Sequence, residues 1–355
     1  YKKAIEIKPN YPEAFNNLGT LYKELKDFDS SIQSYQKAID IKPNYAEAFN
    51  NLGILYKELG QLDKAVQNHK IAININSKYD EAHNNLGILF MELGQLESAI
   101  ESYKSAIKAN KNFIEAINNL GLVLMNLGQI EEAIKYYQKA LKINPSFALT
   151  YNNLGVAYKN LHSHDAASKC FQKSIALEPK YSDALCNYGH LLTEMDNLQD
   201  ALANYEHAFA IKPDADYLLG TIIHTKMHLC IWNEYSNNLN ELQAQINDGQ
   251  KRIDAFSFMA LIDDPEIQGK VSKIYFKDRN PRSNLLPQIK NHPKHNKIKI
   301  GYFSAEFHNH PVLHIMKEIF KNHDQSKFEL YAFSHGKIKE DLWRKDVKHY
   351  FKKFI

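Results

Sequence analysis

The chain has 355 residues, with 44 basic and 41 acidic side chains and a formal net charge of +3 at pH 7. This balance argues against nucleic acid and against an anionic membrane surface as partners. Three cysteines make no disulfide framework, and no apolar run of about 20 residues is present to span a membrane. We therefore expect a protein of the reducing cytoplasm.

One tetrapeptide, Asn-Asn-Leu-Gly, recurs every 34 residues, and a degenerate copy, Cys-Asn-Tyr-Gly, follows at 186–189. A fixed period of this length predicts a stacked-repeat protein. With Gly19 as position 8, residues 1–11 end an earlier repeat, and six full repeats run over 12–45, 46–79, 80–113, 114–147, 148–181 and 182–215.

Each repeat carries two amphipathic patterns of helical period. Small residues at positions 8, 20 and 27 let two helices approach closely, and large residues at positions 7, 11 and 24 fill the space beside them. Prolines end four of the repeats, at Pro43, Pro145, Pro179 and Pro213. The pattern resembles the tetratricopeptide repeat, which implies an α-solenoid over residues 1–215.

Position 6 of every full repeat is an asparagine, although asparagine is a mediocre helix former. In this repeat class, position 6 of the first helix faces the concave groove. The stacked amides would form a ladder there, suited to holding an extended acceptor peptide. The alternative is that they solvate the groove or bond to a neighbouring helix, which is the role we expect for the first asparagine of each pair. The ladder residues are Asn17, Asn51, Asn85, Asn119, Asn153 and Asn187.

The repeat register breaks after Pro213. Residues 216–279 still show helical patterns and predict a helical cap and junction, with Trp232 buried. Residues 280–296 hold three prolines among polar residues and predict a linker.

The pattern of apolar residues changes at Lys297. Residues 299–304 predict a strand, 305–311 a loop, 312–322 a helix, 328–333 a second strand and 341–353 a second helix. This alternation is the opening of a parallel α/β sheet, in which ligands bind beside the loops at the carboxyl ends of the strands.

The loop over 305–311 is rich in histidine and has three possible interpretations. It is a turn without chemistry, a metal site that uses His310 and His314, or the wall of an active-site cleft with His310 beside the substrate. No clear set of carboxylates or thiolates completes a metal site, and the sequence alone leaves the choice open.

The repeats are followed at 297–311 by the sequence Lys-Ile-Lys-Ile-Gly-Tyr-Phe-Ser-Ala-Glu-Phe-His-Asn-His-Pro. This combination resembles the O-linked N-acetylglucosamine transferase family, its bacterial branch most closely. The segments around 216–232 and 328–336 share the resemblance. It implies an inverting protein O-glycosyltransferase with two Rossmann-like lobes, which moves a sugar from a nucleotide sugar to serine or threonine. The donor would be UDP-N-acetylglucosamine, or another such as GDP-fucose, and no metal or other cofactor is implied.

The resemblance also implies roles for particular residues. The histidine of the family's Asn-His-Pro motif lies in the active site and matches His310. The family's ladder asparagines hold the acceptor chain and match the position-6 set.

A catalytic region of this family needs several hundred residues, and fewer than 60 follow Lys297. We therefore expect residues 297–355 to be only the start of the catalytic domain, with the lobe that grips the nucleotide sugar missing. Such a fragment would bind peptide without transferring sugar. The alternative function is a non-catalytic scaffold that presents a peptide groove.

Overall fold

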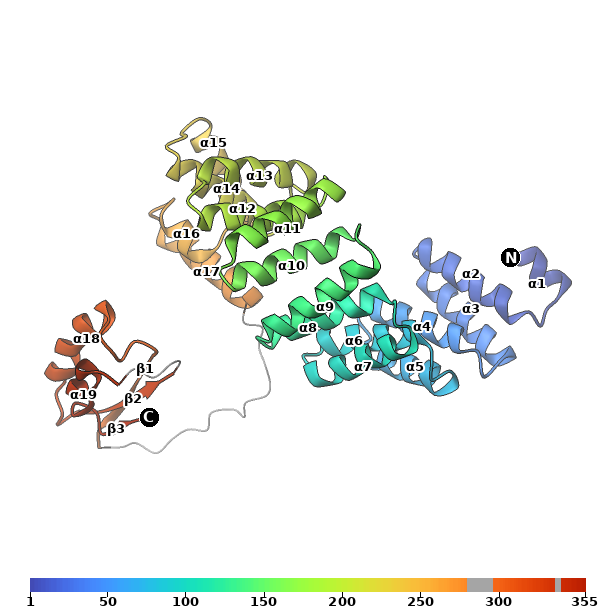
Figure 1. Ribbon diagram of the computed structural model, residues 1–355, viewed down its shortest axis with the longest axis horizontal. Coiled ribbons are helices and arrows are strands. Elements are labelled where there is room, and N and C mark those ends of the chain that lie inside the picture. Colours follow the sequence, from blue (N-terminus) through green and yellow to red (C-terminus); the bar gives the residue numbers. More distant parts are fainter. Residues whose placement is uncertain (280–295, 336–339) are drawn as a thin grey trace. The chain divides into compact units, whose positions relative to one another are not determined.

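The computed structural model describes residues 1–279, 296–335 and 340–355. The chain separates into two compact units, Tyr1–Pro281 and Arg282–Ile355 (Figure 1). Except for its last residue, the expected linker at 280–296 lies outside the described residues. Among the helices that the structure describes, none is both long and apolar enough to cross a membrane.

The first unit begins with α1 (Lys2–Ile7), and each complete repeat then supplies one pair of helices. The pairs are α2 (Pro12–Glu24) with α3 (Phe28–Ile41), α4 (Ala46–Glu58) with α5 (Leu62–Ile75), α6 (Asp80–Glu92) with α7 (Leu96–Ala109), α8 (Ile114–Asn126) with α9 (Ile130–Ile143), α10 (Ala148–Asn160) with α11 (His164–Leu177), and α12 (Ser182–Glu194) with α13 (Leu198–Ile211). This is the mostly helical solenoid that the period predicts.

The two helices of a repeat meet where a glycine of the first faces a ring of the second. A Cβ atom built on Gly121 would lie 2.6 Å from the ring of Tyr137, and one on Gly155 would lie 2.7 Å from that of Phe171. Both rings are fully buried. The glycine is therefore required by close packing, because any side chain there would overlap the ring. In the repeat over 46–79 the ring that faces Gly53 is an imidazole, that of His69.

The turn between the helices of a repeat places one residue in the left-handed region. Gly60, Gly94 and Gly128 have φ of 70°, 71° and 74°. Lys26 and His162 take the same conformation in their own repeats, with φ of 59° and 55°. The turn is therefore set by the packing of the two helices, and glycine makes it easier without being required.

A helical cap follows the repeats, with α14 (Leu218–His228), α15 (Tyr235–Asn247), α16 (Ala255–Met259) and α17 (Pro265–Arg279). Leu218 and Ile222 join the apolar core of the last repeat. The prediction that Trp232 is buried is wrong: 54% of its surface is exposed. It lies in the turn between α14 and α15, where its ring contacts that of Tyr235 edge-on.

The second unit is a parallel three-stranded sheet in the order β1-β2-β3, formed by β1 (Ile298–Ser304), β2 (Phe328–Ser334) and β3 (Lys353–Phe354). Helix α18 (Pro311–Asn322) connects the first two strands, and α19 (Leu342–Lys348) precedes the third. The expected helix over 341–353 is too long. The chain leaves the helix after Lys348, and Lys353 and Phe354 pair with Tyr331 and Ala332 of β2.

The core of the second unit lies between the sheet and these two helices. Phe307, Phe320 and Phe351 are buried there with Leu330 and Val347. Phe307 belongs to the loop after β1, so the loop is anchored in the core by its own phenylalanine. This anchoring positions the polar residues on either side of it.

Candidate functional site

The first candidate site is the face formed by the first helices of the repeats. Neighbouring first helices contact one another directly, α2 with α4, α4 with α6, and onward to α10 with α12. Helices lie closest together on the inner side of a curved stack. The first helices therefore form the concave face of the repeats.

The position-6 asparagines form a regular hydrogen-bonded row along this face. From the second full repeat onward, the Nδ2 of the second asparagine of the pair donates to the Oδ1 of the first asparagine one repeat earlier, 35 residues away. The five bonds run from Asn51 to Asn16 (3.0 Å), Asn85 to Asn50 (3.1 Å), Asn119 to Asn84 (3.1 Å), Asn153 to Asn118 (3.2 Å) and Asn187 to Asn152 (2.9 Å).

The two asparagines of a pair differ in exposure. The first is buried, with Asn16 at 1% and Asn118 at 2% exposed. It bonds to a neighbouring helix, as expected for this set. The second is half-buried from Asn51 onward, and Asn17 is exposed. One amide hydrogen of each ladder residue from Asn51 onward serves the bond between repeats, which leaves the second hydrogen and lone pairs of the Oδ1 to meet a ligand. The Oδ1 of Asn153 also accepts a hydrogen bond from the Nδ2 of Asn152 at 3.4 Å.

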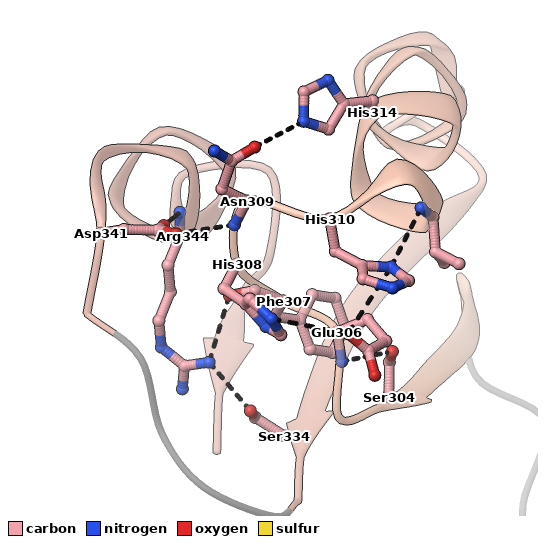
Figure 2. A network of polar contacts seen from close by, with 11 residues as sticks. Ser304, Glu306, Phe307, His308, Asn309, His310, His314, Ser334, Asp341 and Arg344 are labelled. Carbon is pink, nitrogen blue, oxygen red and sulfur yellow. Dashed lines mark hydrogen bonds and ion pairs between the residues drawn. The ribbon is translucent and has the colours of Figure 1, made fainter. Parts of the chain in front are cut away.

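The second candidate site lies at the carboxyl edge of the sheet, where Ser304 and Ser334 end their strands side by side. Arg344 of α19 is almost fully buried beneath this edge, at 5% exposure. Its Nη1 donates to the Oγ of Ser334 (2.8 Å) and to the carbonyl of Phe307 (3.4 Å), and its Nε donates to Glu340 (3.1 Å). One guanidinium thus joins β2, the loop after β1 and α19 (Figure 2).

The loop places one carboxylate between two imidazoles. Oε2 of Glu306 is 3.5 Å from Nε2 of His308 and 3.5 Å from Nδ1 of His310. The Oγ of Ser304 accepts a hydrogen bond from the backbone of Glu306 at 2.9 Å. The side chain of His310 is 39% exposed and that of His308 13%, so His310 is the more accessible of the two.

His310 caps α18. Its Nδ1 accepts a hydrogen bond from the backbone N–H of Val312 at 3.3 Å. A neutral ring that accepts at Nδ1 carries its proton on Nε2. The neutral ring can therefore donate a hydrogen bond through Nε2.

The end of the loop is held by α19. The Oδ2 of Asp341 accepts from the backbone of Asn309 (2.6 Å) and its Oδ1 from that of Arg344 (2.8 Å). These two backbone hydrogen bonds, the one from Arg344 first, lower the pKa of Asp341 below its ordinary value. His314 turns away from His310, and its Nε2 lies 2.8 Å from Oδ1 of Asn309 (Figure 2). The ring of His314 packs against that of Trp343.

Sequence reasoning found the histidines but missed Arg344, Asp341 and Ser334. Asp341 carried one local signal, because aspartate before a helix is a good N-cap. Nothing local links it to Asn309 or links Arg344 to Phe307, 37 residues away. His310 and His314 bond to different partners, and among the described residues no group of three or more histidine, cysteine, aspartate or glutamate side chains could hold a metal ion.

Two solved structures share the fold of the repeats. The Cut9–Hcn1 hetero-tetramer of APC/C has a TM-score of 0.57 at 19% identity, over 63% of this chain and 44% of that one. A tetratricopeptide repeat protein from Parabacteroides merdae has a TM-score of 0.54 at 17% identity, over 75% of this chain and 98% of that one. Models of the tetratricopeptide repeat match residues between 1 and 203. The chain is thus a tetratricopeptide-repeat protein.

Residues 273–355 match the model of glycosyl transferase family 41. The repeats are therefore followed by a segment that is similar to that family, and this segment contains the histidine loop. A curated relative from Arabidopsis thaliana, a "Probable UDP-N-acetylglucosamine--peptide N-acetylglucosaminyltransferase SEC", is 26% identical over 142 residues. The alignment covers 36% of this chain, and the chain spans 14% of the length of that relative.

Proposed function

We propose that this chain is part of a protein O-glycosyltransferase. In the proposal, an inverting enzyme transfers N-acetylglucosamine from UDP-N-acetylglucosamine, or a sugar from another nucleotide-sugar donor, to serine or threonine hydroxyls of cytoplasmic proteins. The observation that carries it is the family 41 match over 273–355, which includes the loop at the carboxyl edge of the sheet. The name of the Arabidopsis relative supports the choice of donor and acceptor.

His310 is the residue that we assign to the active site. Its Nδ1 is engaged by the backbone of Val312, so the neutral ring offers Nε2–H as a donor and no lone pair at that nitrogen. This favours orienting an oxygen of the acceptor or donor over removing a proton directly. The diphosphate leaving group develops negative charge as the sugar departs. We assign its stabilisation to a part of the enzyme other than this chain.

The asparagine ladder is the proposed acceptor site. Its bonds between repeats hold each amide in one orientation, so a bound peptide would meet a pre-organised row of donors and acceptors. Replacing Asn119, Asn153 and Asn187 together with alanine is expected to weaken binding of an acceptor peptide about tenfold or more. Fluorescence anisotropy measures this, with Asn68→Ala on the second helix α5 as the control. Unchanged affinity in the triple variant, with helicity retained, would remove the ladder from the acceptor site.

The catalytic assignment is tested by expressing this sequence together with whatever its gene encodes after Ile355. Transfer of labelled N-acetylglucosamine to a serine- or threonine-containing peptide is measured for the parent protein, for His310→Ala and for His349→Ala. His349 is an exposed histidine at the end of α19 and serves as the control. We expect His310→Ala to lose about a hundredfold in rate and His349→Ala to keep the parent rate. Equal rates in all three would refute the role of His310.

A second function, a peptide-binding scaffold without catalysis, is favoured by one observation: the ladder belongs wholly to the first unit. Peptide binding without sugar transfer by the longer expressed protein would support the scaffold over the enzyme. The 1–355 chain alone is expected to bind peptide and to transfer no sugar, and transfer by it would refute that expectation.

A further inference from the structure

A basic hollow lies on the side of the repeats opposite the asparagine ladder. It is bounded by α7 and α9, which are second helices, and has a volume of about 550 Å³. Ile107 and Ile143, both half-buried, supply apolar surface within it. Five exposed lysines surround this apolar surface: Lys104, Lys108, Lys111, Lys139 and Lys142.

The lysines are not accounted for by ion pairing within the repeats. Over the described ranges, none of the five has a carboxylate oxygen within 4.0 Å. Lys108 and Lys142 lie in the last turns of their helices, where a positive charge complements the helix dipole. Lys104, Lys111 and Lys139 have no such reason, and Lys111 replaces the proline that ends four other repeats.

The positively charged surface does not extend along the full length of the two helices, because the first turn of each helix carries glutamate. Glu97 lies in the first turn of α7, and Glu131 and Glu132 in that of α9. A long polyanion that crossed the hollow would meet these carboxylates and be repelled. All five cations are lysines, which bind as flexible point charges and suit several separate carboxylates.

We propose that this hollow is a docking site for a short acidic peptide segment of a partner protein. Aspartate and glutamate side chains of the segment meet the lysines, and an aliphatic side chain packs against Ile107 and Ile143. Because the site lies on the outer helices, it is separate from the concave face proposed for acceptors. A partner could therefore be held while an acceptor occupies the ladder.

The test uses the full 1–355 chain and a fluorescein-labelled peptide, Glu-Asp-Glu-Leu-Leu-Glu-Asp-Glu, in anisotropy titrations at low and at physiological ionic strength. The variant Lys104→Glu with Lys139→Glu reverses two charges in the hollow. The control, Lys70→Glu with Lys173→Glu, makes the same change in net charge at the same two repeat positions, in the repeats on either side. Circular dichroism verifies that both variants keep the helicity of the parent chain.

We expect the hollow variant to weaken binding about tenfold or more, and the control to weaken it less than about threefold. Replacing both leucines of the peptide with glutamine should also weaken binding about tenfold, because the apolar contact is lost. Equal effects of the two variants, or no effect of either, would overturn the proposal. Tighter binding of single-stranded oligothymidine or of phosphatidylserine vesicles than of the peptide, with the same sensitivity to the hollow variant, would also overturn it.

Discussion

His69 occupies the position where the other repeats carry tyrosine or phenylalanine, and His69→Phe tests how this exception affects stability. The imidazole is fully buried against Gly53. Its Nδ1 is 3.0 Å from the Oδ1 of Asn50, while its Nε2 has no hydrogen-bond partner within the described part of the chain. Burial, with a smaller contribution from the charge of Lys57, lowers the pKa of His69 from 6.5 to about 4.

The lowered pKa makes the free energy of unfolding depend on pH. The folded chain holds His69 neutral, whereas the unfolded chain protonates it below about pH 6.5. The stabilising contribution is therefore complete above pH 6.5 and is lost as the pH falls toward 4. The shift of about 2.5 units corresponds to about 3 kcal/mol in total, of which about 2 kcal/mol is lost between pH 7 and pH 5.

Phenylalanine fits this position without titrating, as Phe171 does against Gly155. At pH 7 the free energy of unfolding of the variant should lie within about 1 kcal/mol of that of the parent, because the variant gains apolar burial and loses one hydrogen bond. Asn50 keeps its bond from Asn85. Between pH 7 and pH 5 the variant should become more stable than the parent by about 2 kcal/mol.

The assay is urea unfolding followed by circular dichroism at pH 7, 6 and 5 for the parent, for His69→Phe and for His207→Gln. His207 is an exposed histidine of α13 and controls for the loss of any titrating imidazole. Other groups titrate equally in all three proteins, so the differences isolate His69. A constant difference between His69→Phe and the parent across this range would refute the reasoning.

Three further substitutions test packing and polar contacts by their effect on the free energy of unfolding. Asn153→Ala removes the hydrogen bond to Asn118 of the repeat before. We expect the free energy of unfolding to fall by up to about 1 kcal/mol, although alanine is the better helix former. A gain in stability would show that the ladder bond contributes nothing. Gly121→Ala should cost about 1–3 kcal/mol in urea unfolding, because its Cβ would overlap the buried ring of Tyr137, and no loss would mean that the ring can move aside. Arg344→Met should lower the free energy of unfolding of the second unit by about 1–3 kcal/mol, because the hydrogen bonds to Phe307 and Ser334 are lost. This would be seen as a loss of near-ultraviolet dichroism at a lower urea concentration, with the helicity of the repeats unchanged. Unaltered unfolding of that unit would contradict the role of the guanidinium.

The repeat architecture could be predicted from the sequence because its signals are local. The 34-residue period, the small residues at three positions and the ring at position 24 each act within one helix pair. The strand–helix alternation after Lys297 was equally readable, since a period of two and a period of 3.6 are distinct. The helix end at Lys348 was missed because the pairing of Lys353 with β2 decides it, and that pairing joins residues 22 apart.

Tertiary structure alone decided how the polar side chains are used. The asparagine pairs are visible in the sequence, but the direction of their bonds, from the second asparagine of one repeat to the first of the repeat before, depends on how the repeats stack. From the sequence alone, Arg344 would be expected to be an exposed charged residue on a short helix. Only the fold places it where it bonds to Ser334 and Phe307. Trp232 is exposed because the turn between two cap helices leaves its ring outside the core. Local patterns set which segments are helix or strand, whereas burial and polar pairing depend on which distant segments meet in space.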